Sequence, residues 1–307
     1  MRIFTRIKNY ISNPDYRFAI NSKLGLYRNM PDDEFLKKKF KIAMGKELDL
    51  ENPRTFCEKL QWMKAYDHNP RYTMLADKYE VKKIIAEEIG EQYVIPLYGV
   101  WDSFDEIDFD SLPEQFILKC THNSGGFVIC KDKSNFDKAS ARKKFNKWLK
   151  RNYYDVGREW VYKNIKPRII AEKYIPTLGN RDSIEYKLTC FDGEVKLITI
   201  CQGIPHDSLD SRTNDHYDRD FNRLDWYAYY KNPVVPNEIP EQMPEMIEIA
   251  EKLSKGICQV RVDFYIIDGQ IYFGEMTFYT WGGYIEFVPP ERDEIMGSYI
   301  KLPEKRI

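Results

Sequence analysis

The chain of 307 residues has no long apolar segment, almost no net charge and no recognisable secretory leader. No apolar run approaches the roughly 20 residues that a membrane-spanning helix needs, so we expect no transmembrane segment. A formal charge of −1 gives no overall field to attract nucleic acid, and we expect no nucleic-acid partner. The first residues lack the continuous apolar block and the small-residue cleavage site of a secretory signal. These absences together predict a cytoplasmic protein.

Two kinds of short motif are also missing. The six cysteines include no Cys-x-x-Cys pair, and most of them lie in apolar, strand-like segments. We therefore expect buried free thiols rather than disulfides or a zinc site. The chain contains neither a Walker A motif nor Gly-x-Gly-x-x-Gly, the glycine-rich loops of many nucleotide-binding proteins. A nucleotide site in this chain needs another phosphate-binding arrangement.

Helix and strand patterns alternate along the chain, each marked by an apolar stripe or a short alternating run. We expect helices within residues 1–50 and at 73–90, 137–151 and 240–255, and strands near 93–95, 98–101, 116–130, 168–175, 185–200 and 260–277. We interpret residues 203–237 as a long irregular loop that faces the substrate, since such loops in compact domains are usually functional or disordered. The pattern predicts an α+β, or mixed α/β, protein built around a cleft.

The first expected helix carries an apolar stripe next to basic side chains. The stripe consists of Ile3, Phe4, Ile7, Tyr10 and Ile11, and the basic residues are Arg2, Arg6 and Lys8. Our first interpretation is a helix docked on the body of the protein. Contact with a membrane surface is the alternative, because an apolar face flanked by lysine and arginine suits the lipid interface.

The segment 258–277 has the most informative pattern, two strands joined by a tight turn. Because strand side chains alternate between faces, Arg261 and Asp263 share one face of the first strand. The same rule groups three side chains of the second strand, which are Phe273, Glu275 and Thr277. One face of this hairpin therefore concentrates charged and polar groups.

The turn decides whether the two carboxylates of this hairpin meet. A two-residue turn at Asp268-Gly269 would place Asp263 and Glu275 on opposite faces, whereas a type I turn with Gly269 as a left-handed bulge residue brings them to the same face. We expect the second arrangement. Two carboxylates and an arginine on one face then suggest a hard cation that carries phosphate oxygens. The alternative is an ordinary hairpin with a solvated, charged outer face.

Three weaker signals lie upstream of the hairpin. Lys119 ends a strand and precedes Asn123-Ser124-Gly125-Gly126, where backbone N–H groups can approach phosphate. Glu172-Lys173 ends an apolar strand near Ile175, a candidate hinge whose backbone can pair with an adenine edge. Lys187, on a later strand, is placed to stabilise a transferring phosphoryl group if it faces the cleft. An ordinary hairpin loop, a charged strand end and a solvated lysine are the respective alternatives.

The order of these signals resembles the ATP-grasp superfamily, and most closely its TupA-like branch, which is linked to teichuronopeptide and capsular polysaccharide synthesis. The similarity rests on Ala76-Asp77-Lys78, Leu112-Pro113-Glu-Gln-Phe-Ile-Leu-Lys119, Tyr186-Lys187-Leu-Thr-Cys-Phe-Asp-Gly193, Arg261-Val-Asp263-Phe-Tyr265, Phe273-Gly274-Glu275-Met-Thr277 and Gly297-Ser-Tyr-Ile-Lys-Leu-Pro303. The resemblance implies an ATP-grasp fold, in which antiparallel sheets of two lobes clasp ATP. It divides the chain into an N-terminal helical and α/β region (1–112), a lid with the glycine loop (113–176) and a C-terminal part with the metal hairpin (177–307).

The resemblance also implies roles for single residues. ATP would be held by Lys78, Lys119, Ser124, Gly125, Gly126, Glu172, Lys173, Ile175 and Asp182. Magnesium would be bound by Asp263, Glu275 and Thr277, and the catalytic residues would be Arg261 and Lys187. Many ATP-grasp enzymes have an asparagine where this chain has Thr277, which leaves open whether one or two Mg²⁺ ions bind.

The implied activity is ATP-dependent ligation of a carboxylate to an amine through an acyl phosphate. By resemblance, the substrates are a hexuronic acid of a surface polysaccharide or its precursor and an amino acid or another amine. Candidate substrate contacts are the cations Arg212, Arg219 and Arg223 and the aromatics Trp226, Tyr227 and Trp281. The alternatives are a sugar or alcohol kinase with the same Mg-ATP site, a non-catalytic nucleotide-binding scaffold, and a capsule glycosyltransferase with Asp218-Arg-Asp220 as its metal motif.

Overall fold

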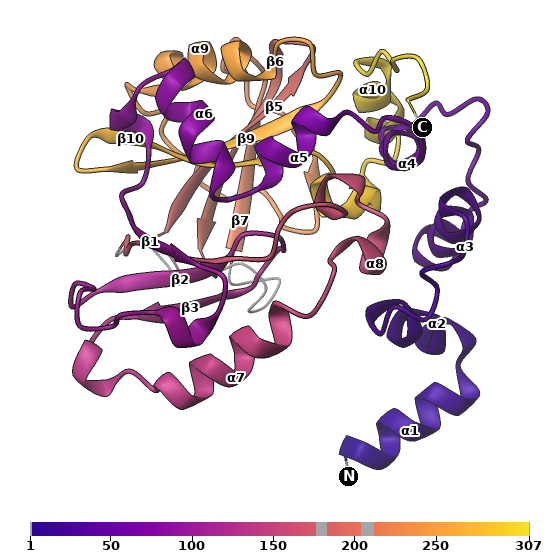
Figure 1. The fold of residues 1–307 in the computed structure, drawn as a ribbon. Coiled ribbons are helices and arrows are strands. Elements are labelled where there is room, and N and C mark those ends of the chain that lie inside the picture. Colours follow the sequence, from indigo (N-terminus) through magenta and orange to yellow (C-terminus); the bar gives the residue numbers. More distant parts are fainter. Residues whose placement is uncertain (1, 176–182, 204–211, 307) are drawn as a thin grey trace.

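The computed structural model describes residues 2–175, 183–203 and 212–306 (Figure 1). These residues form two larger antiparallel sheets, a two-stranded antiparallel sheet of β8 (Tyr227–Ala228) and β11 (Phe287–Val288), and helices packed around them. The α-helices are α1 (Arg2–Ser12), α2 (Pro14–Lys23), α3 (Asp32–Met44), α4 (Phe56–Tyr66), α5 (Pro70–Ala76), α6 (Glu80–Glu88), α7 (Lys138–Trp148), α8 (Tyr154–Gly157), α9 (Met243–Ser254) and α10 (Arg292–Ser298). The strands are β1 (Leu97–Trp101), β2 (Phe116–Cys120), β3 (Phe127–Cys130), β4 (Ile169–Lys173), β5 (Ile184–Phe191), β6 (Glu194–Gly203), β7 (Arg212–Tyr217), β8 (Tyr227–Ala228), β9 (Val260–Ile267), β10 (Gln270–Thr277) and β11 (Phe287–Val288). Short 3-10 segments include η1 (Glu91–Tyr93), η4 (Trp160–Tyr162) and η5 (Thr280–Gly283).

The smaller sheet has the strand order β1-β4-β2-β3 and forms the lower lobe in Figure 1. One of its faces packs against α7 through Phe116 and Phe145, which belong to a separate hydrophobic core. The other face carries charge. Ile117 pairs with Glu172 across the sheet, so Lys119, two residues further along β2, lies on the face of Glu172 and diagonally next to it.

The larger sheet has the order β10-β9-β5-β6-β7 and is covered on one face by α9. Met246 and Ala250 of α9 share a core with Phe56 of α4, so the N-terminal helices pack with this sheet rather than forming a core of their own. The start of α4 is set by a capping box, in which the side chains of Thr55 and Glu58 accept from each other's backbone N–H groups. In Figure 1, α5, α6 and α9 lie together over this larger lobe.

The helix expected at 73–90 is divided in two. The first part, α5, ends at Ala76, and the backbone at Asp77 is extended (φ −73°, ψ 116°). The Asp77 carboxylate accepts a hydrogen bond from the backbone N–H of Tyr79 (2.8 Å). An aspartate that bonds to the backbone two residues further on in this way stabilises a turn that competes with continuation of the helix. The break directs Lys78 toward the small lobe, where its N–H donates to the Thr121 carbonyl (3.3 Å).

Two other predictions of secondary structure were wrong. Residues 91–93 form the turn η1, and the first strand begins only at Leu97. Residues 212–217 were expected to be irregular, but they form β7 at the edge of the larger sheet. Its buried side chains are mostly polar, because one face lines a pocket, and the usual alternation of apolar residues is therefore missing. The remaining expected helices and hairpins are confirmed, and all six cysteines are free thiols.

The hairpin of β9 and β10 brings its carboxylates together by a route that was not expected. Asp268 and Gly269 both have positive φ (52° and 78°) and form a two-residue turn. The register instead shifts further along β10, where Gly274 is an extra residue. This bulge pairs Glu275 directly with Asp263, so the expectation of a shared face is confirmed.

The bulge also corrects the grouping of Phe273 with Glu275. Phe273 pairs with Phe264 and is buried in the core, whereas Glu275 lines the pocket. A glycine suits position 274 because a Cβ there would lie 2.9 Å from Cε2 of Tyr265 and 3.0 Å from the carbonyl oxygen of Asp263. The close approach of the two backbones therefore sets the face on which Glu275 lies.

The first helix, α1, projects from the rest of the molecule and packs on α2 (Figure 1). Phe4, Ile7 and Ile11 are 79%, 52% and 70% exposed, so the interpretation of a helix docked through its apolar stripe is wrong for these side chains. Within the described residues, every helix is too short or too polar to cross a bilayer.

We predict that Gly274→Ala destabilises the protein by about 1–3 kcal/mol, because the added methyl group overpacks the bulge. Urea unfolding followed by circular dichroism measures the change. Gly269→Asn in the turn of the same hairpin is the matched control. A Cβ at this position meets nothing within 4 Å, and asparagine tolerates positive φ, so this variant should lose less than about 1 kcal/mol. Equal effects of the two changes would contradict the role of the bulge.

Candidate functional site

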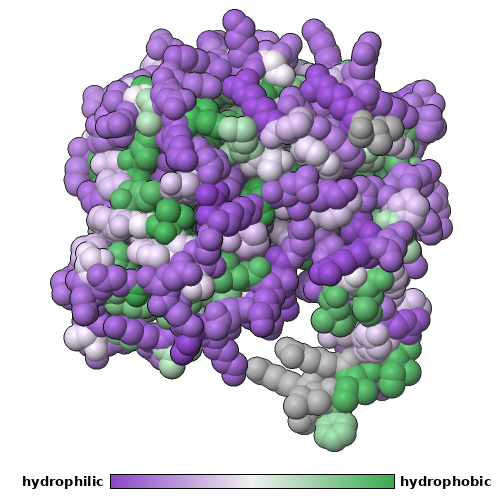
Figure 2. Space-filling view, viewed as in Figure 1, coloured by the Kyte–Doolittle hydropathy of each residue, from purple (hydrophilic) through white to green (hydrophobic). Residues whose placement is uncertain are grey.

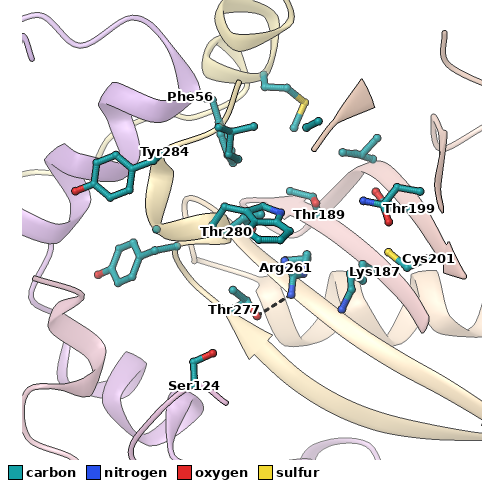
Figure 3. A pocket seen from close by; sticks show the side chains of 18 of the residues that line it. Phe56, Ser124, Lys187, Thr189, Thr199, Cys201, Arg261, Thr277, Thr280 and Tyr284 are labelled. Carbon is teal, nitrogen blue, oxygen red and sulfur yellow. Dashed lines mark hydrogen bonds between the residues drawn. The ribbon is translucent and has the colours of Figure 1, made fainter. Parts of the chain in front are cut away.

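A pocket of about 550 Å³ lies on one face of the larger sheet (Figure 3). Five of the residues expected in the site line this pocket, namely Ser124, Lys187, Arg261, Glu275 and Thr277. Ser124 comes from the loop between β2 and β3, and the other four come from β5, β9 and β10. The pocket therefore lies where the glycine loop of the small lobe meets the larger sheet, and its volume suits a small-molecule site.

The centre of the site is a buried carboxylate held by two cations. The Asp263 carboxylate accepts from Nε and Nη2 of Arg261 (2.6 and 2.7 Å) and from Nζ of Lys187 (2.5 Å). Burial alone would raise the pKa of Asp263, but the two cations outweigh it and lower the pKa below its ordinary value. Asp263 is therefore ionised at neutral pH, although it is only 2% exposed.

The same ion network continues to a residue that sequence reasoning missed. Glu185 accepts from Lys187 (3.1 Å) and from Arg212 (2.7 Å). Burial opposes ionisation here too, yet the Lys187 and Arg212 cations lower the pKa of Glu185 to about 2. Glu185 stands two residues before Lys187 on β5, so strand alternation alone was enough to place it on the same face. Positive and negative charges thus compensate each other along this face.

Glu275 and Thr277 extend the network toward the opening of the pocket. The Thr277 hydroxyl accepts from Arg261 (3.1 Å) and donates to Glu275 (3.2 Å). Two carboxylates and a hydroxyl on one face are oxygen donors of the kind that Mg²⁺ prefers, so the residues fit such an ion. Within the described residues, no group of three or more His, Cys, Asp or Glu side chains is arranged to hold a metal. A cation at this pair would need further oxygen ligands, such as phosphate.

A second buried carboxylate lies in the small lobe. Glu172 is 4% exposed in its side chain and pairs with Lys119 (2.6 Å) and Lys82 (2.9 Å). Burial would raise its pKa, but the two lysines lower the pKa to about 2. Sequence reasoning missed Lys82, which lies on α6 beside the exposed Lys83, and no local pattern distinguishes the two. Lys82 also donates to the carbonyl of Ile95 (2.9 Å), which fixes its position.

Lys78 holds the glycine loop rather than reaching into the pocket. Its Nζ donates to the carbonyl of Asn123 (2.8 Å), and the Asn123 side chain accepts from the N–H of Gly126 (3.2 Å). Gly125 has positive φ (78°), a conformation that glycine adopts without strain. These contacts shape the loop so that Ser124 lines the pocket.

The remaining residues expected near adenine follow Glu172 along the chain. Lys173 is exposed and its backbone N–H donates to the carbonyl of Pro96 (2.9 Å), whereas Ile175 is buried. Asp182 lies outside the described residues. Burial raises the phenol pKa of Tyr265 on β9, and the negative charge of Glu185 raises it further.

The sheets, the glycine loop and the hairpin with its paired carboxylates agree with one family. Residues 58–301, most of the chain, match the model of the TupA-like ATP-grasp family. The chain belongs to the TupA-like ATP-grasp family. The expected family and the expected ATP-grasp ligase fold, mixed α/β with antiparallel sheets, are thereby confirmed. A search of curated proteins found no match.

Several solved structures are similar to this TupA-like ATP-grasp protein at low identity. D-alanine–D-alanine ligase from Bacillus anthracis in complex with ATP is 20% identical over 67% of this chain and 55% of that one, with a TM-score of 0.41. D-cycloserine synthetase DcsG is 14% identical over 80% and 73% (TM-score 0.41). A RimK domain ATP-grasp protein from Sphaerobacter thermophilus is 10% identical over 75% and 69% (TM-score 0.41). The chain thus spans about half the length of the first of these proteins, 55%.

The cations expected to contact a substrate separate into two groups. Arg212 lines the pocket of the TupA-like protein, paired with Glu185. Arg219 forms an ion pair with Glu251 (2.9 Å) and does not line the pocket, and Arg223 is held by the buried Asp215 (2.7 Å). Only Arg212 of the three is therefore close enough to act on a molecule in this pocket.

The expected aromatic contacts also differ in their surroundings. Trp226 lines the pocket, but it is only 3% exposed and stacks on His216, which also lines the pocket, with ring centroids 4.1 Å apart. Trp281 lines the pocket, is 38% exposed and lies 4.4 Å from the ring of Tyr229. Tyr227 does not line the pocket. Trp281 is thus the aromatic side chain of the three that is open to a bound molecule.

We predict that Glu172→Gln destabilises the protein by about 3 kcal/mol at neutral pH, because Lys82 and Lys119 would stay partly buried without a counter-charge. The folded pKa of Glu172, about 2, lies below its ordinary value of 4.5. Its contribution is therefore complete above pH 4.5 and is lost as the pH falls toward 2. Urea unfolding across this pH range measures the difference between the two stability curves.

The matched control for this prediction is Glu114→Gln, which changes an exposed glutamate just before β2. It should alter stability by less than about 0.5 kcal/mol at every pH. A wild-type-like stability curve for Glu172→Gln would contradict the importance of the buried ion pair.

Proposed function

We propose that this protein is an ATP-dependent carboxylate–amine ligase that works through an acyl phosphate. The observation that carries the proposal is the direct pairing of the buried Asp263 with Glu275, which lines a pocket together with Arg261 and the glycine-loop residue Ser124. The TupA-like ATP-grasp family supports it. The proposed location is the cytoplasm, which agrees with the free thiols and with ATP as a substrate.

In the proposed complex, the phosphates of ATP lie under the glycine loop and the adenine lies along the small sheet. Lys119 pairs with Glu172 (2.6 Å) and offers its ammonium group to phosphate, while Lys78 shapes the loop that carries Ser124, Gly125 and Gly126. Lys173 and Ile175 border the adenine. Asp182, which lies outside the described residues, is the proposed partner of the ribose. We assign the lid to residues 113–176, so that movement of the small lobe excludes water from the acyl phosphate.

The proposed metal ligands are Asp263 and Glu275, with Thr277 as a third oxygen donor. A bound Mg²⁺ neutralises charge on the phosphates during transfer. Asp263 is already ionised and needs no proton release to accept a cation. Arg261 and Lys187 now occupy its oxygens, and both become available to other anions when a cation takes that place.

The proposed chemistry has two steps. A carboxylate oxygen of the first substrate attacks the γ-phosphorus, and ADP leaves with the bonding electron pair. An amine nitrogen then attacks the carbonyl carbon, the bond to phosphate breaks toward oxygen, and the nitrogen gives up a proton. Arg261 and Lys187 are placed to bind the oxygens that carry charge in both steps, where preorganised donors lower the barrier.

We propose a uronic acid of a surface polysaccharide, or of its precursor, as the carboxylate substrate. The family supports this assignment, since its members are linked to such polymers, and so does the chemistry of the pocket wall. Trp281, which is 38% exposed, offers an aromatic face for the apolar side of a sugar ring, and Arg212 offers a cation for its carboxylate.

Two alternative functions differ in the observations that bear on them. A sugar or alcohol kinase would share the nucleotide site but form a stable phosphorylated product without an amine. The glycosyltransferase alternative has little support, because the Asp218 carboxylate accepts from the backbone N–H groups of Asp220 and Asn222 (2.9 Å each) and closes a turn away from the pocket.

We predict that Asp263→Asn and Glu275→Gln each reduce ATP turnover at least about 100-fold, because each removes a charge that binds the metal. ADP release in the presence of Mg²⁺, uronic acids and amines measures turnover, and circular dichroism checks the fold. Asp268→Asn in the exposed turn of the same hairpin is the control and should keep full activity. Turnover like that of the wild type in either site variant would refute the metal assignment.

We also propose that α1 contacts an anionic membrane surface. Phe4, Ile7 and Ile11 are exposed on this helix, and Leu24 and Leu26 are exposed beside it (62% and 64%). Figure 2 shows apolar colour gathered at this end of the molecule. The sequence of residues 2–28 contains six basic side chains and one acidic one, which complements anionic lipid headgroups.

The expected result is co-sedimentation of the protein with vesicles of phosphatidylcholine and phosphatidylglycerol, and much less with phosphatidylcholine alone. The triple variant Phe4→Ser, Ile7→Ser and Ile11→Ser should bind these vesicles at least about tenfold more weakly, because three apolar side chains no longer enter the lipid. Val234→Ser with Val235→Ser is the control, because these exposed valines lie outside α1. Concentration-dependent self-association in place of vesicle binding would identify a second copy of the chain as the partner instead.

A further inference from the structure

A second pair of opposite charges lines the same pocket and has no part in the proposed nucleotide site. Lys39 comes from α3, and Glu159 directly precedes η4. A Cβ placed on Gly157 would lie 3.3 Å from Nζ of Lys39 and 3.4 Å from Oε1 of Glu159. The two charged atoms therefore flank one small space. Among the described residues, no lysine or arginine lies within the 4.0 Å ion-pair distance of Glu159.

Both groups are removed from bulk water without a direct partner of opposite charge. Burial raises the pKa of Glu159, although the Lys64 and Lys39 cations act to lower it. Burial lowers the pKa of Lys39 to about 8, while Glu159 opposes this shift. Charges desolvated in this way are costly unless something pairs with them. A ligand that brings one positive and one negative group would satisfy both.

The surroundings fix the position of the Lys39 side chain. Nζ of Lys39 donates to the carbonyl of Val156 (2.7 Å) and lies 5.0 Å from the ring centre of Tyr284. Behind them, the buried Lys64 donates to Gln61 (3.0 Å) and to the carbonyl of Gly282 (2.6 Å). Lys64 is therefore occupied in fixing the turn η5. Lys39 and Glu159 are the charged members of this group that line the pocket.

The pair lines the same pocket as Arg261 and Glu275 of the proposed reaction centre. Tyr162 also lines the pocket, and burial raises its phenol pKa. The charges of Glu159 and Glu275 raise that pKa further, and Arg261 lowers it, so one phenol lies within electrostatic range of both groups of residues. A molecule held by Glu159 can therefore extend toward the place where Arg261 would hold the acyl phosphate.

We propose that Lys39 and Glu159 form the binding site of the amine substrate, and that this substrate is a free α-amino acid. Its ammonium group pairs with Glu159 and its carboxylate pairs with Lys39. The assignment rests on the proposed ligase function and deepens it, because an amine without a carboxylate would leave Lys39 unpaired. Recognition of both charges thus discriminates amino acids from simple amines and from simple acids.

Binding to the full-length protein saturated with Mg²⁺ and a non-hydrolysable ATP analogue tests this proposal. Calorimetric titration compares the standard amino acids with their decarboxylated amines and with the acids that lack the amino group, for example glycine with methylamine and acetate. At least one amino acid should bind, and each truncated counterpart of the tightest binder should bind at least about tenfold more weakly, as expected for loss of one charge-assisted hydrogen bond.

Glu159→Gln and Lys39→Met should each weaken amino-acid binding at least about tenfold and leave binding of the nucleotide analogue unchanged. Lys39→Arg keeps the charge and should retain most of the affinity. Lys37→Met, which changes an exposed lysine of the same helix, is the matched control and should have no effect. The comparison of ligands on the wild-type protein remains decisive if a variant fails to fold.

The proposal is overturned if no amino acid binds better than its decarboxylated amine while the nucleotide analogue still binds. It is also overturned if folded Glu159→Gln and Lys39→Met bind amino acids as the wild type does, since the pair would then serve only to anchor α3. Failure of the nucleotide analogue to bind would instead refute the proposed ATP-dependent function, so the two failures are distinguishable.

Discussion

The one-residue register shift at Gly274 is the constraint on which the proposed site depends. Without it, Glu275 would pair with Val262 and point into the core, and Asp263 would be the only carboxylate of the hairpin on the pocket face. The backbones approach so closely at this position that a side chain on residue 274 would collide with Tyr265. The bulge at Gly274 thus decides that the carboxylates of Asp263 and Glu275 lie on the same face. Strand alternation accounts for the arginine and the lysine beside them.

Buried charge is balanced separately in the two lobes. On the larger sheet, the carboxylates of Asp263 and Glu185 are matched by Arg261, Lys187 and Arg212. On the smaller sheet, Glu172 is matched by two lysines, which leaves a net positive charge next to the proposed phosphate site. Such networks are poor sources of stability, because desolvation cancels much of the attraction. They do keep ionised groups in fixed positions before a ligand arrives, which is what stabilisation of transferring charge requires.

The N-terminal helices contribute to the pocket as well as to the core. Lys39 on α3 forms part of its wall, and Gln61 and Lys64 on α4 fix the turn η5 through the carbonyls of Gly282 and Gly283. In that turn, Trp281 has positive φ (51°), a conformation that is strained for a bulky residue and is found mainly where the surroundings enforce it. Two helices outside the sheets, α3 and α4, therefore hold the part of the pocket wall that Lys39 and η5 form.

The sequence by itself determined the family, the hairpins and most of the charged residues of the site, because strand alternation and motif order are properties of neighbouring residues. It did not determine the type of turn in the hairpin or the position of the bulge, which lies at Gly274 on β10 and not at Gly269. It also did not determine the break at Asp77 that separates Lys78 from the preceding helix. Only the tertiary structure brought Lys82 to Glu172, and Lys39 to Glu159, across distances in the chain that no local pattern spans. The physical reason is that the electrostatic interaction between two charges depends on their distance in space and is stronger when they are buried. Partners that are far apart in the sequence can therefore be identified only in the folded chain.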